Sequence, residues 1–474
     1  MQIRGARRSL KRVGFAAAVA AAHEPQYPAP MRGAIAAGHP LTAEAGARVL
    51  REGGNAVDAM LAAAFTAFVT EGPLTGPAGG GFLLVQEPSR GTTVLDCFFA
   101  APSTRLGEME EVLIDFGDSG TQIFHMGPGS VAVPGLLAGL EEAHRRFATR
   151  EWADLVSPAI GLAREGFERD DARVFLHRIL GPILLRDEGG RRIYGQPDRV
   201  VTEEACATLE RVRDAGSAVA AEIIPEFADD IRAYRVASPP PLETTALGYD
   251  IESTPAPSLG GTVVERILDL LAAAGDPSVE DLARAVADAY GPHGSGPLPG
   301  TTHVSVVDGT GMAAALSSTL GSGSGLFRGG TQLNNMLGEL DVIGPGDKVP
   351  GERLSSMMTP TLVLEHGRPR VVIGSAGSVR LAGAIAQVTW RILRGEHVDN
   401  AIRAPRLHVE GTTVHLEGGW TDADAASLPA SWNVVRWEGI NLFFGGVQAV
   451  LRAADGKLEA AGDPRRGGAG VVVT

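Results

Sequence analysis

The sequence predicts an α/β fold in which helices cover the outer faces of stacked β-sheets. Residues 42–68 have the apolar spacing of two consecutive helices. From Thr301 onwards the pattern changes to short apolar strands joined by tight turns, and one of these strands runs directly into a helix. Helices packed outside stacked sheets accommodate this order of elements.

The first half of the chain is predicted to be mainly helical. The first helix ends at Gly53-Gly54, and Asn55 is a good N-cap for a second helix that is apolar almost all round and should be buried. A glycine-rich loop then leads into a strand within GPAGGGFLLVQ (76–86), and TTVLDCFF (92–99) supplies a partner strand.

The spacing of apolar residues predicts further helix from after Pro134-Gly135 to about residue 187. It predicts helix again over residues 202–236. Apolar helices flank the next segment, SPPPLETTALGYDIESTPAPSLGG (238–261), which we interpret as a proline-rich connection within a domain. No internal repeat is visible.

Three hairpins are predicted in the second half. TTHVSVVD (301–308) and MAAALSSTL (312–320) flank a Gly-Thr-Gly turn, and residues 361–374 form a second pair around His366-Gly367-Arg368. The second hairpin continues through a glycine loop into a helix over 379–394, and residues 443–463 form the third hairpin.

Composition excludes several classes of protein. The chain has 474 residues, 44% of them hydrophobic and 21% charged, which is typical of a globular protein with a large core. Its net charge of −14 argues against a nucleic-acid binder, which needs a basic face.

No apolar run approaches the ~18 residues of a membrane span. Cys97 and Cys206 cannot form a disulfide framework, and the histidines show no metal-binding spacing, so no metal or other cofactor is expected.

The N-terminal segment 1–32 has two interpretations. Basic residues, including the pair Arg7-Arg8, precede the apolar run Val13 to Ala22, as in a twin-arginine signal peptide, but this run is mostly alanine. The segment can equally be an arm, or Met31 can be the true start. We expect a cytoplasmic protein, with export through an N-terminal signal as the alternative.

The segment Gly374–Ser378 joins a predicted strand to a predicted helix. Such a loop aims unpaired backbone N–H groups and the positive end of the helix dipole at whatever lies there. Because the lysine of a phosphate-binding loop is missing, an oxyanion hole for acyl transfer is the better functional interpretation, beside that of a plain structural turn.

Two nucleophile candidates can be compared. Gly117-Asp118-Ser119-Gly120 mimics the signature of a serine protease, but only His23 and His39 precede it, and their region is predicted to be helical, so an exposed turn is the better interpretation. Thr301 follows Pro299-Gly300 and can act as a nucleophile if its own α-amino group is the base. That chemistry requires cleavage of the preceding peptide bond, and Thr319 on the returning strand could reach Thr301.

Many segments resemble the γ-glutamyltransferases, which are N-terminal-nucleophile enzymes that cleave themselves into two subunits. The resemblance covers about Ala34 to Gly470 and is carried, in order, by GHPLTAEAGARVLREGGNAVDA (38–59), GPAGGGF (76–82), PAIGLAREGF (158–167), GYDIESTPAPSLGG (248–261), TTHVSVVDGTG (301–311), Leu333-Asn334-Asn335, LSSMMTPT (354–361), APRLH (404–408) and DPRRGG (463–468).

The resemblance implies a four-layer αββα sandwich in one domain, built from a large-subunit part (33–300) and a small-subunit part (301–474). Cleavage between Gly300 and Thr301 would give chains 1–300 and 301–474, which remain together as a heterodimer. By the resemblance, Thr301 is the nucleophile and Thr319 orients it. Gly377 and Ser378 form the oxyanion hole. Ser355 and Ser356 bind the α-carboxylate of the substrate, and Glu339 binds its α-amino group.

Five departures from the family pattern concern the substrate. Phe98 stands where γ-glutamyl enzymes carry the arginine that pairs with the α-carboxylate, and phenylalanine cannot replace that contact. Gly321 replaces an asparagine, Met336 a polar residue and Ser378 a glycine. The stretch from Glu339 to Ser355 is also shorter than in family members with a lid over the pocket.

We therefore expect a self-processing amide hydrolase or acyltransferase that acts on a small-molecule amide, with neither nucleic acid nor membrane as a partner. The substrate is a γ-glutamyl amide such as glutathione or a related small acyl amide. The alternatives are an acylase of the same fold for another amide, of the cephalosporin-acylase or oxamate-hydrolase type, and a homologue that binds ligand without turnover.

Overall fold

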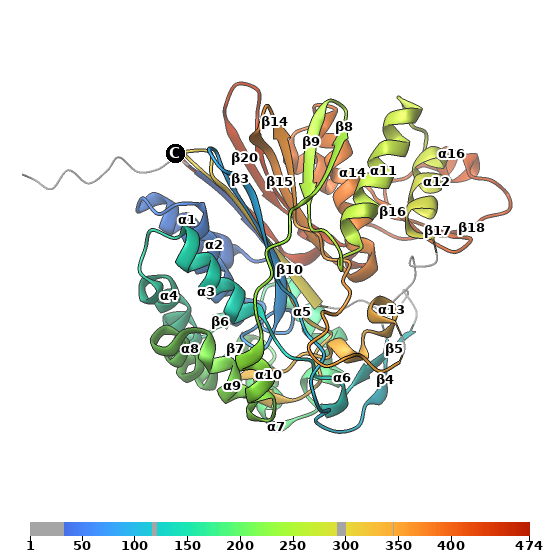
Figure 1. Ribbon diagram of the computed structural model, residues 1–474. Helices are drawn as coiled ribbons and strands as arrows, with labels where there is room; N and C mark the ends of the chain where they lie inside the picture. Colours follow the sequence, from blue (N-terminus) through green and yellow to red (C-terminus); the bar gives the residue numbers. More distant parts are fainter. Residues whose placement is uncertain (1–32, 116–120, 292–299, 345) are drawn as a thin grey trace, which may run out of the picture.

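The computed structural model describes residues 33–115, 121–291, 300–344 and 346–474. Two six-stranded antiparallel sheets lie face to face in the middle of the molecule, and helices cover the outer face of each (Figure 1). The predicted α/β fold with its αββα layering is confirmed.

The first sheet interleaves strands from distant parts of the sequence. Its β10–β11 hairpin lies between two strands from the first hundred residues, so each strand of the hairpin has an N-terminal neighbour. The strands, in spatial order, are β21 (Ala469–Val473), β1 (Gly33–Ala37), β10 (Gly300–Asp308), β11 (Ala313–Gly321), β2 (Gly80–Glu87) and β3 (Gly91–Cys97).

The second sheet contains the other two predicted hairpins and one that was not predicted. In spatial order its strands are β20 (Leu458–Gly462), β19 (Gly446–Arg452), β15 (Arg368–Ala376), β14 (Thr361–Glu365), β9 (Tyr249–Ser253) and β8 (Leu242–Ala246).

The interpretation of residues 238–261 as a connection is wrong for its central part. Residues 242–253 form the β8–β9 hairpin, with Leu247 and Gly248 at positive φ in the turn. Pairing of β9 with β14 completes the sheet, and this contact joins residues more than a hundred positions apart. Flanking prolines and alternating acidic residues hid the strands, because an edge hairpin with one solvated face needs few apolar side chains.

Helices cover the first sheet on the left-hand side of Figure 1. Asn55 caps the buried α2 with a capping box, as predicted, whereas His39 caps α1. The predicted helical stretches after Pro134 and over 202–236 are broken into several shorter helices. The helices of this half are α1 (Pro40–Arg51), α2 (Ala56–Thr70), α3 (Leu136–Phe147), α4 (Trp152–Glu165), α5 (Asp171–Ile179), α6 (Gly181–Leu184), α7 (Glu188–Tyr194), α8 (Glu203–Ala215), α9 (Val219–Ile223) and α10 (Ala228–Ala233).

The second sheet is covered on the right-hand side of Figure 1, mainly by α11 and α14. The helices of this part are α11 (Gly260–Ala274), α12 (Val279–Tyr290), α13 (Leu340–Ile343), α14 (Leu381–Leu393), α15 (Val398–Arg403) and α16 (Asp422–Ser427). Short strands outside the two sheets are β4 (Glu110–Asp115), β5 (Thr121–Met126), β6 (Phe167–Glu168), β7 (Arg199–Val200), β12 (Phe327–Arg328), β13 (Thr331–Gln332), β16 (Leu407–Glu410), β17 (Thr413–Leu416) and β18 (Asn433–Arg436).

Small side chains fill the space between the sheets. Ala34 and Ala36 of β1 and Ala313 and Ala315 of β11 are fully buried there, in one cluster with the larger side chains of the facing sheet. Close approach of the two sheets follows from this alternation of small and large residues.

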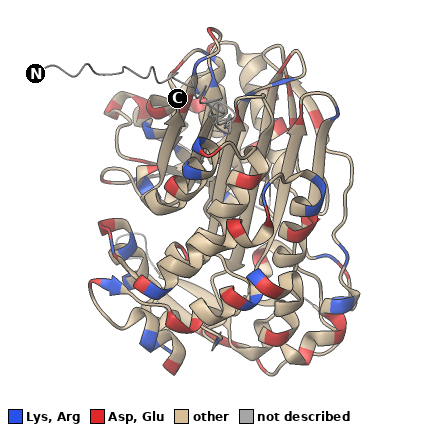
Figure 2. Cartoon of the chain, turned by 90° about the vertical axis from the view of Figure 1, so that its left-hand side faces the viewer, with Lys and Arg blue, Asp and Glu red and all other residues tan. Residues whose placement is uncertain are grey.

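Acidic and basic residues are interspersed along the outer helices on the side of the molecule shown in Figure 2. A face of mixed charge gives no support to phosphate-backbone binding. In the described ranges, every helix falls short of the length and hydropathy needed to cross a membrane.

Candidate active site

Thr301 and Thr319 face each other near the end of the β10–β11 hairpin. They are register partners, and the Thr301 hydroxyl donates to Thr319 Oγ1 at 3.4 Å. Both side chains are buried. The hairpin predicted from the sequence thus brings together the two threonines whose proximity it suggested.

The peptide bond between Gly300 and Thr301 lies in the same hydrogen-bonded group. The Thr319 hydroxyl donates to the carbonyl oxygen of Gly300 and accepts a hydrogen bond from the Gly321 N–H at 2.8 Å. A Cβ on Gly300 would lie 2.8 Å from the Gly321 carbonyl oxygen, so a larger residue would displace this strand end. The arrangement polarises one backbone carbonyl next to a threonine hydroxyl.

The segment between α2 and β2 holds both strands of the hairpin from the helical side. Thr302 Oγ1 donates to Glu71 at 2.6 Å, and the hydroxyls of Thr75 and Ser318 are 2.8 Å apart. Thr302 and Ser318 are register partners next to the pair of Thr301 and Thr319. Burial raises the pKa of Glu71, an effect partly offset by the nearby guanidinium of Arg173. These contacts, which sequence reasoning missed, fix the ends of two strands that carry Thr301 and Thr319.

The predicted glycine loop supplies free donors. Gly377 has φ 130° and Ser378 has φ 61°, and neither backbone N–H donates to an acceptor within the described residues. The loop follows β15 and precedes α14, whose dipole adds positive potential. This geometry can bind an anionic oxygen.

One small cavity of about 30 Å³ collects most of the predicted site residues, and it has room for about two water molecules. Gly377 adjoins the cavity through Ser378, whereas Ser355 is not among its lining residues. The lining consists of Phe98, Thr301, Thr319, Met336, Glu339, Val342, Ser356, Met357, Met358, Ser378 and Leu381.

Glu339 lines this cavity. Its Oε1 accepts hydrogen bonds from the Ser322 N–H at 3.1 Å and the Ser322 hydroxyl at 2.9 Å, whereas its Oε2 has no partner among the described residues. Burial raises the pKa of Glu339 to about 7, although the bonds from Ser322 lower it. The group can therefore switch between a hydroxyl donor and a carboxylate acceptor near neutral pH.

Phe98 forms part of an aromatic wall. Its ring stacks on Phe82 at 5.2 Å between centroids and meets Phe99 edge-on at 5.0 Å. Among the described residues that line the cavity there is no lysine or arginine. An α-carboxylate in this space would therefore have no cationic side chain to pair with.

The sequence analysis did not predict four of the apolar residues that line the cavity. These are Val342, Met357, Met358 and Leu381. The two methionines belong to the segment LSSMMTPT, where the serines drew attention because of their hydroxyls. Met358 N–H donates to Ser356 Oγ at 3.0 Å, so the Ser356 hydroxyl oxygen is already engaged in an internal bond.

Gly321 adopts φ 66°, and a Cβ there would lie 2.2 Å from Asn335 Oδ1. Asn335 Oδ1 accepts hydrogen bonds from Ser322 N–H at 2.7 Å and Gly323 N–H at 3.0 Å. The turn after β11 therefore has no space for the asparagine that the family pattern places at 321.

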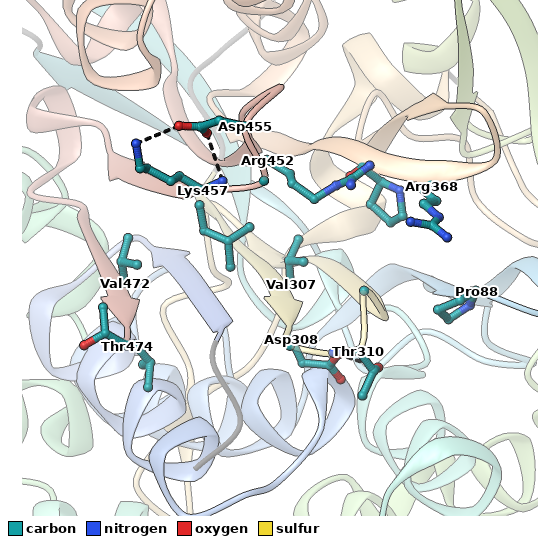
Figure 3. A pocket seen from close by; sticks show the side chains of 16 residues that line it. Pro88, Val307, Asp308, Thr310, Arg368, Arg452, Asp455, Lys457, Val472 and Thr474 are labelled. Carbon is teal, nitrogen blue, oxygen red and sulfur yellow. Dashed lines mark hydrogen bonds and ion pairs between the residues drawn. The ribbon is translucent and has the colours of Figure 1, made fainter. Parts of the chain in front are cut away.

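A larger hollow of about 890 Å³ opens at the other end of the sandwich (Figure 3). Hairpin tips line it, including Asp308 at the end of β10 with Thr310 in the following turn, and Asp455 with Lys457 between β19 and β20. It lies at the opposite end of β10 from Thr301, about 20 Å away at the rise of a β-strand. This hollow is therefore separate from the threonine pair.

The segment Gly117–Gly120, the other nucleophile candidate, lies outside the described residues. In the described ranges, no three His, Cys, Asp or Glu side chains lie together as a metal ion would require.

The sequence matches the gamma-glutamyltranspeptidase family over residues 42–290 and 283–473. The chain belongs to this family. It is therefore an enzyme of the N-terminal-nucleophile type, a hydrolase or transpeptidase, and the resemblance found in the sequence is confirmed.

Curated relatives of this family member include proteins with different activities. It is 28% identical over 532 residues to the glutathione hydrolase proenzyme of Escherichia coli K12, with 92% of this chain and 90% of the relative covered. It is 27% identical over 536 residues to the acylase ACY 1 proenzyme of Pseudomonas sp. strain SE83, with 94% of each covered. Both relatives are proenzymes, which implies that this chain also cleaves itself into subunits.

Among solved structures, the cephalosporin acylase from Bacillus halodurans aligns with a TM-score of 0.78 at 20% identity, covering 95% of this chain and 99% of that chain. Similarity at this identity shows the shared fold.

Proposed function

We propose that this enzyme matures by cleaving itself between Gly300 and Thr301 and then hydrolyses amides of short, largely apolar acyl groups. The observation that carries the proposal is the cavity beside Thr301, whose walls are aromatic and aliphatic and whose ionisable lining residue is Glu339. This pattern favours an acylase over a hydrolase of glutathione.

Maturation follows from the bonds around Gly300. The Thr301 hydroxyl attacks the Gly300 carbonyl carbon while the Thr319 hydroxyl stabilises the charge that develops on the carbonyl oxygen. The C–N bond breaks, the Thr301 nitrogen takes a proton, and an ester links Gly300 to Thr301 Oγ1. Water hydrolyses this ester and releases chains 1–300 and 301–474.

Turnover uses the amine that maturation creates. The Thr301 α-amino group takes the hydroxyl proton as Oγ1 attacks the substrate carbonyl, and the N–H groups of Gly377 and Ser378 hold the oxyanion. Collapse of the intermediate expels the amine, which receives the proton, and water then hydrolyses the acyl-enzyme. Thr319 orients Oγ1 throughout.

Acyl selectivity rests on Phe98 and Glu339. An α-carboxylate on the acyl group would meet apolar walls and the like charge of Glu339, and its anchors would be Ser356 and, at the edge, Ser355. An amino group at that carbon would instead pair with the free oxygen of Glu339. The preferred acyl chain is therefore neutral or amine-bearing.

A matched set of four 4-nitroanilides tests this selectivity. The four acyl groups are γ-glutamyl, 4-aminobutyryl, glutaryl and butyryl. Compared with γ-glutamyl, 4-aminobutyryl lacks the α-carboxylate, glutaryl lacks the amine, and butyryl lacks both. We expect kcat/KM to be highest for 4-aminobutyryl and butyryl, lower for γ-glutamyl and lowest for glutaryl. A γ-glutamyl preference with micromolar KM would contradict the proposal and restore the γ-glutamyl amide as substrate.

Maturation is tested separately by electrophoresis and N-terminal sequencing. The smaller chain should begin at Thr301, and Thr301→Ala should remain a single chain. A wild-type protein that stays uncut on incubation would favour the homologue that binds ligand without turnover.

A further inference from the structure

The hydroxyl of Ser378 has no hydrogen-bond partner among the described residues, although Ser378 is only 4% exposed. It begins the short helical turn Ser378–Arg380, yet its side chain caps no backbone N–H there. The residue lines the same cavity as Thr301 and Thr319. A buried hydroxyl without an internal partner is costly unless something else in the reaction cycle bonds to it.

The backbone of Ser378 supports the same conclusion. Its φ of 61° lies in the left-handed region, which glycine adopts without strain and serine does not. Backbone strain of this kind collects at functional sites, where the surrounding structure holds the residue in place. The family pattern has glycine at this position, so the chain carries a strained side chain where none is needed for the turn.

The position of the hydroxyl limits its role. Ser378 lines the same cavity as Thr301, and the backbone N–H groups of Gly377 and Ser378 donate to no acceptor among the described residues. A hydroxyl can donate one proton to an oxygen there. The group that gains negative charge beside the nucleophile is the substrate carbonyl oxygen in the tetrahedral intermediate.

We propose that the Ser378 hydroxyl is a third donor of the oxyanion hole and hence a catalytic residue for amide hydrolysis. This inference rests on the proposed function. As Thr301 Oγ1 bonds to the carbonyl carbon, the π-electron pair moves onto the carbonyl oxygen, and the hydroxyl proton goes to the Thr301 amine. The Ser378 hydroxyl donates to that oxygen until the carbonyl reforms and the C–N bond breaks.

Two substitutions separate the hydroxyl from the backbone. Ser378→Ala removes the hydroxyl and keeps Cβ and its strain, whereas Ser378→Gly removes both. We expect kcat for the butyryl anilide to fall by about ten- to hundredfold in both variants, with KM within about twofold, because the lost bond belongs to the transition state. If kcat fell in Ser378→Ala but equalled the wild-type value in Ser378→Gly, the effect would come from backbone strain, and the proposal would be overturned. An unchanged kcat in both variants would also overturn it.

Thr389→Val provides a matched control. Thr389 lies on α14, is fully buried and also has an unpartnered hydroxyl, but it does not line the cavity. Its kcat should equal that of the wild type. A loss as large as that of Ser378→Ala would show that any buried hydroxyl of this region matters, and would overturn the proposal.

Inhibition by propylboronic acid gives a readout besides turnover. Boron replaces the butyryl carbonyl carbon and forms a tetrahedral adduct with Thr301, so Ser378→Ala should weaken its binding by about the same factor as kcat/KM. Equal affinity in wild type and Ser378→Ala would overturn the proposal. If the protein matures and hydrolyses the butyryl anilide, but the Ser378 substitutions change neither kcat nor boronate affinity, only this inference is refuted. If the small chain never forms, the proposed function is refuted.

Discussion

At the scale of single residues, the site combines unpaired polar atoms with an apolar wall. Glu339 Oε2 and Ser378 Oγ are buried and find no partner in the part of the chain that the structure describes, and Phe98 and Met336 lie among the same lining residues. A cavity of this kind binds ligands mainly by shape and apolar contact, and a few polar groups set their orientation. The effect of each polar atom can therefore be measured with substrates that differ by one group.

Glu339 should impose a pH dependence on amine recognition. Because burial raises its pKa to about 7, the carboxylate form needed to pair with an amine becomes dominant only above that pH. The ratio of kcat/KM for 4-aminobutyryl over butyryl anilide should rise as pH increases through about 7, and taking the ratio cancels the titration of the Thr301 amine. Glu339→Gln should make the ratio independent of pH over this range; a ratio that still rises would assign the titration to another group.

The raised pKa of Glu339 also affects stability. A carboxyl group whose pKa is higher in the folded than in the unfolded state favours folding most at low pH, where it is protonated in both states. This contribution is lost as pH rises from about 4.5 to about 7. In the Glu339→Gln variant, the unfolding free energy should therefore decrease less over this pH range. Denaturant titration of the uncut Thr301→Ala chain, with and without Glu339→Gln, measures the difference.

Phe98→Arg should convert the acyl preference. The guanidinium would pair with an α-carboxylate, a contact worth about 1.5–3 kcal/mol, so kcat/KM for γ-glutamyl anilide should rise by about ten- to hundredfold, chiefly through KM. The ring it replaces stacks on Phe82, which an arginine can also do. Phe98→Leu is the control that loses the ring without adding charge, and an equal gain there would refute the charge argument.

At the scale of elements, the β10–β11 hairpin carries Thr301 and Thr319, but residues 71–75 hold its end in place. Thr75 bonds to Ser318, Leu320 N–H donates to the Leu74 carbonyl at 2.9 Å, and Glu71 bonds to Thr302. Side chains alternate along a strand, so Thr302 and Ser318 face the helices while Thr301 and Thr319 face the other way. One face of the hairpin thus positions the other.

Thr75→Val should test this positioning. Loss of the bond to Ser318 should lower the unfolding free energy of the Thr301→Ala chain by about 1 kcal/mol. In the active background, the small chain should also appear more slowly, because the Thr319 end of β11 is held less firmly. The control is Thr254→Val, since the Thr254 hydroxyl is buried without a partner elsewhere; reduced stability with an unchanged maturation rate would limit Thr75 to a structural role.

At the scale of the whole molecule, the two chains produced by cleavage are interleaved. In the first sheet, β10 and β11 of the C-terminal part lie between β1 and β2 of the N-terminal part, and in the second sheet β14 pairs with β9. Separation would break four strand pairings, β1 with β10, β1 with β21, β2 with β11 and β9 with β14, and would expose the apolar side chains packed between the sheets. The proposed cut after Gly300 would therefore free an amine without dividing the domain.

The matured protein should accordingly migrate as a single species with the mass of both chains in size-exclusion chromatography. The chains should separate only at denaturant concentrations that also unfold the sheets, as followed by circular dichroism. Release of the smaller chain under native conditions would contradict the interleaved pairing.

The sequence by itself determined what depends on neighbouring residues: the α1–α2 pair with its Asn55 cap, the hairpins from Thr301 onwards, and the glycine loop at Gly377. Segment motifs also indicated the family, and with it Thr301, Thr319 and Glu339. Only the tertiary structure decided contacts between distant segments, such as Thr302 with Glu71, the β8–β9 edge hairpin, and the apolar lining from Met357, Met358 and Leu381. Hairpins and caps follow from local backbone geometry, whereas a cavity wall is set by how separate layers pack.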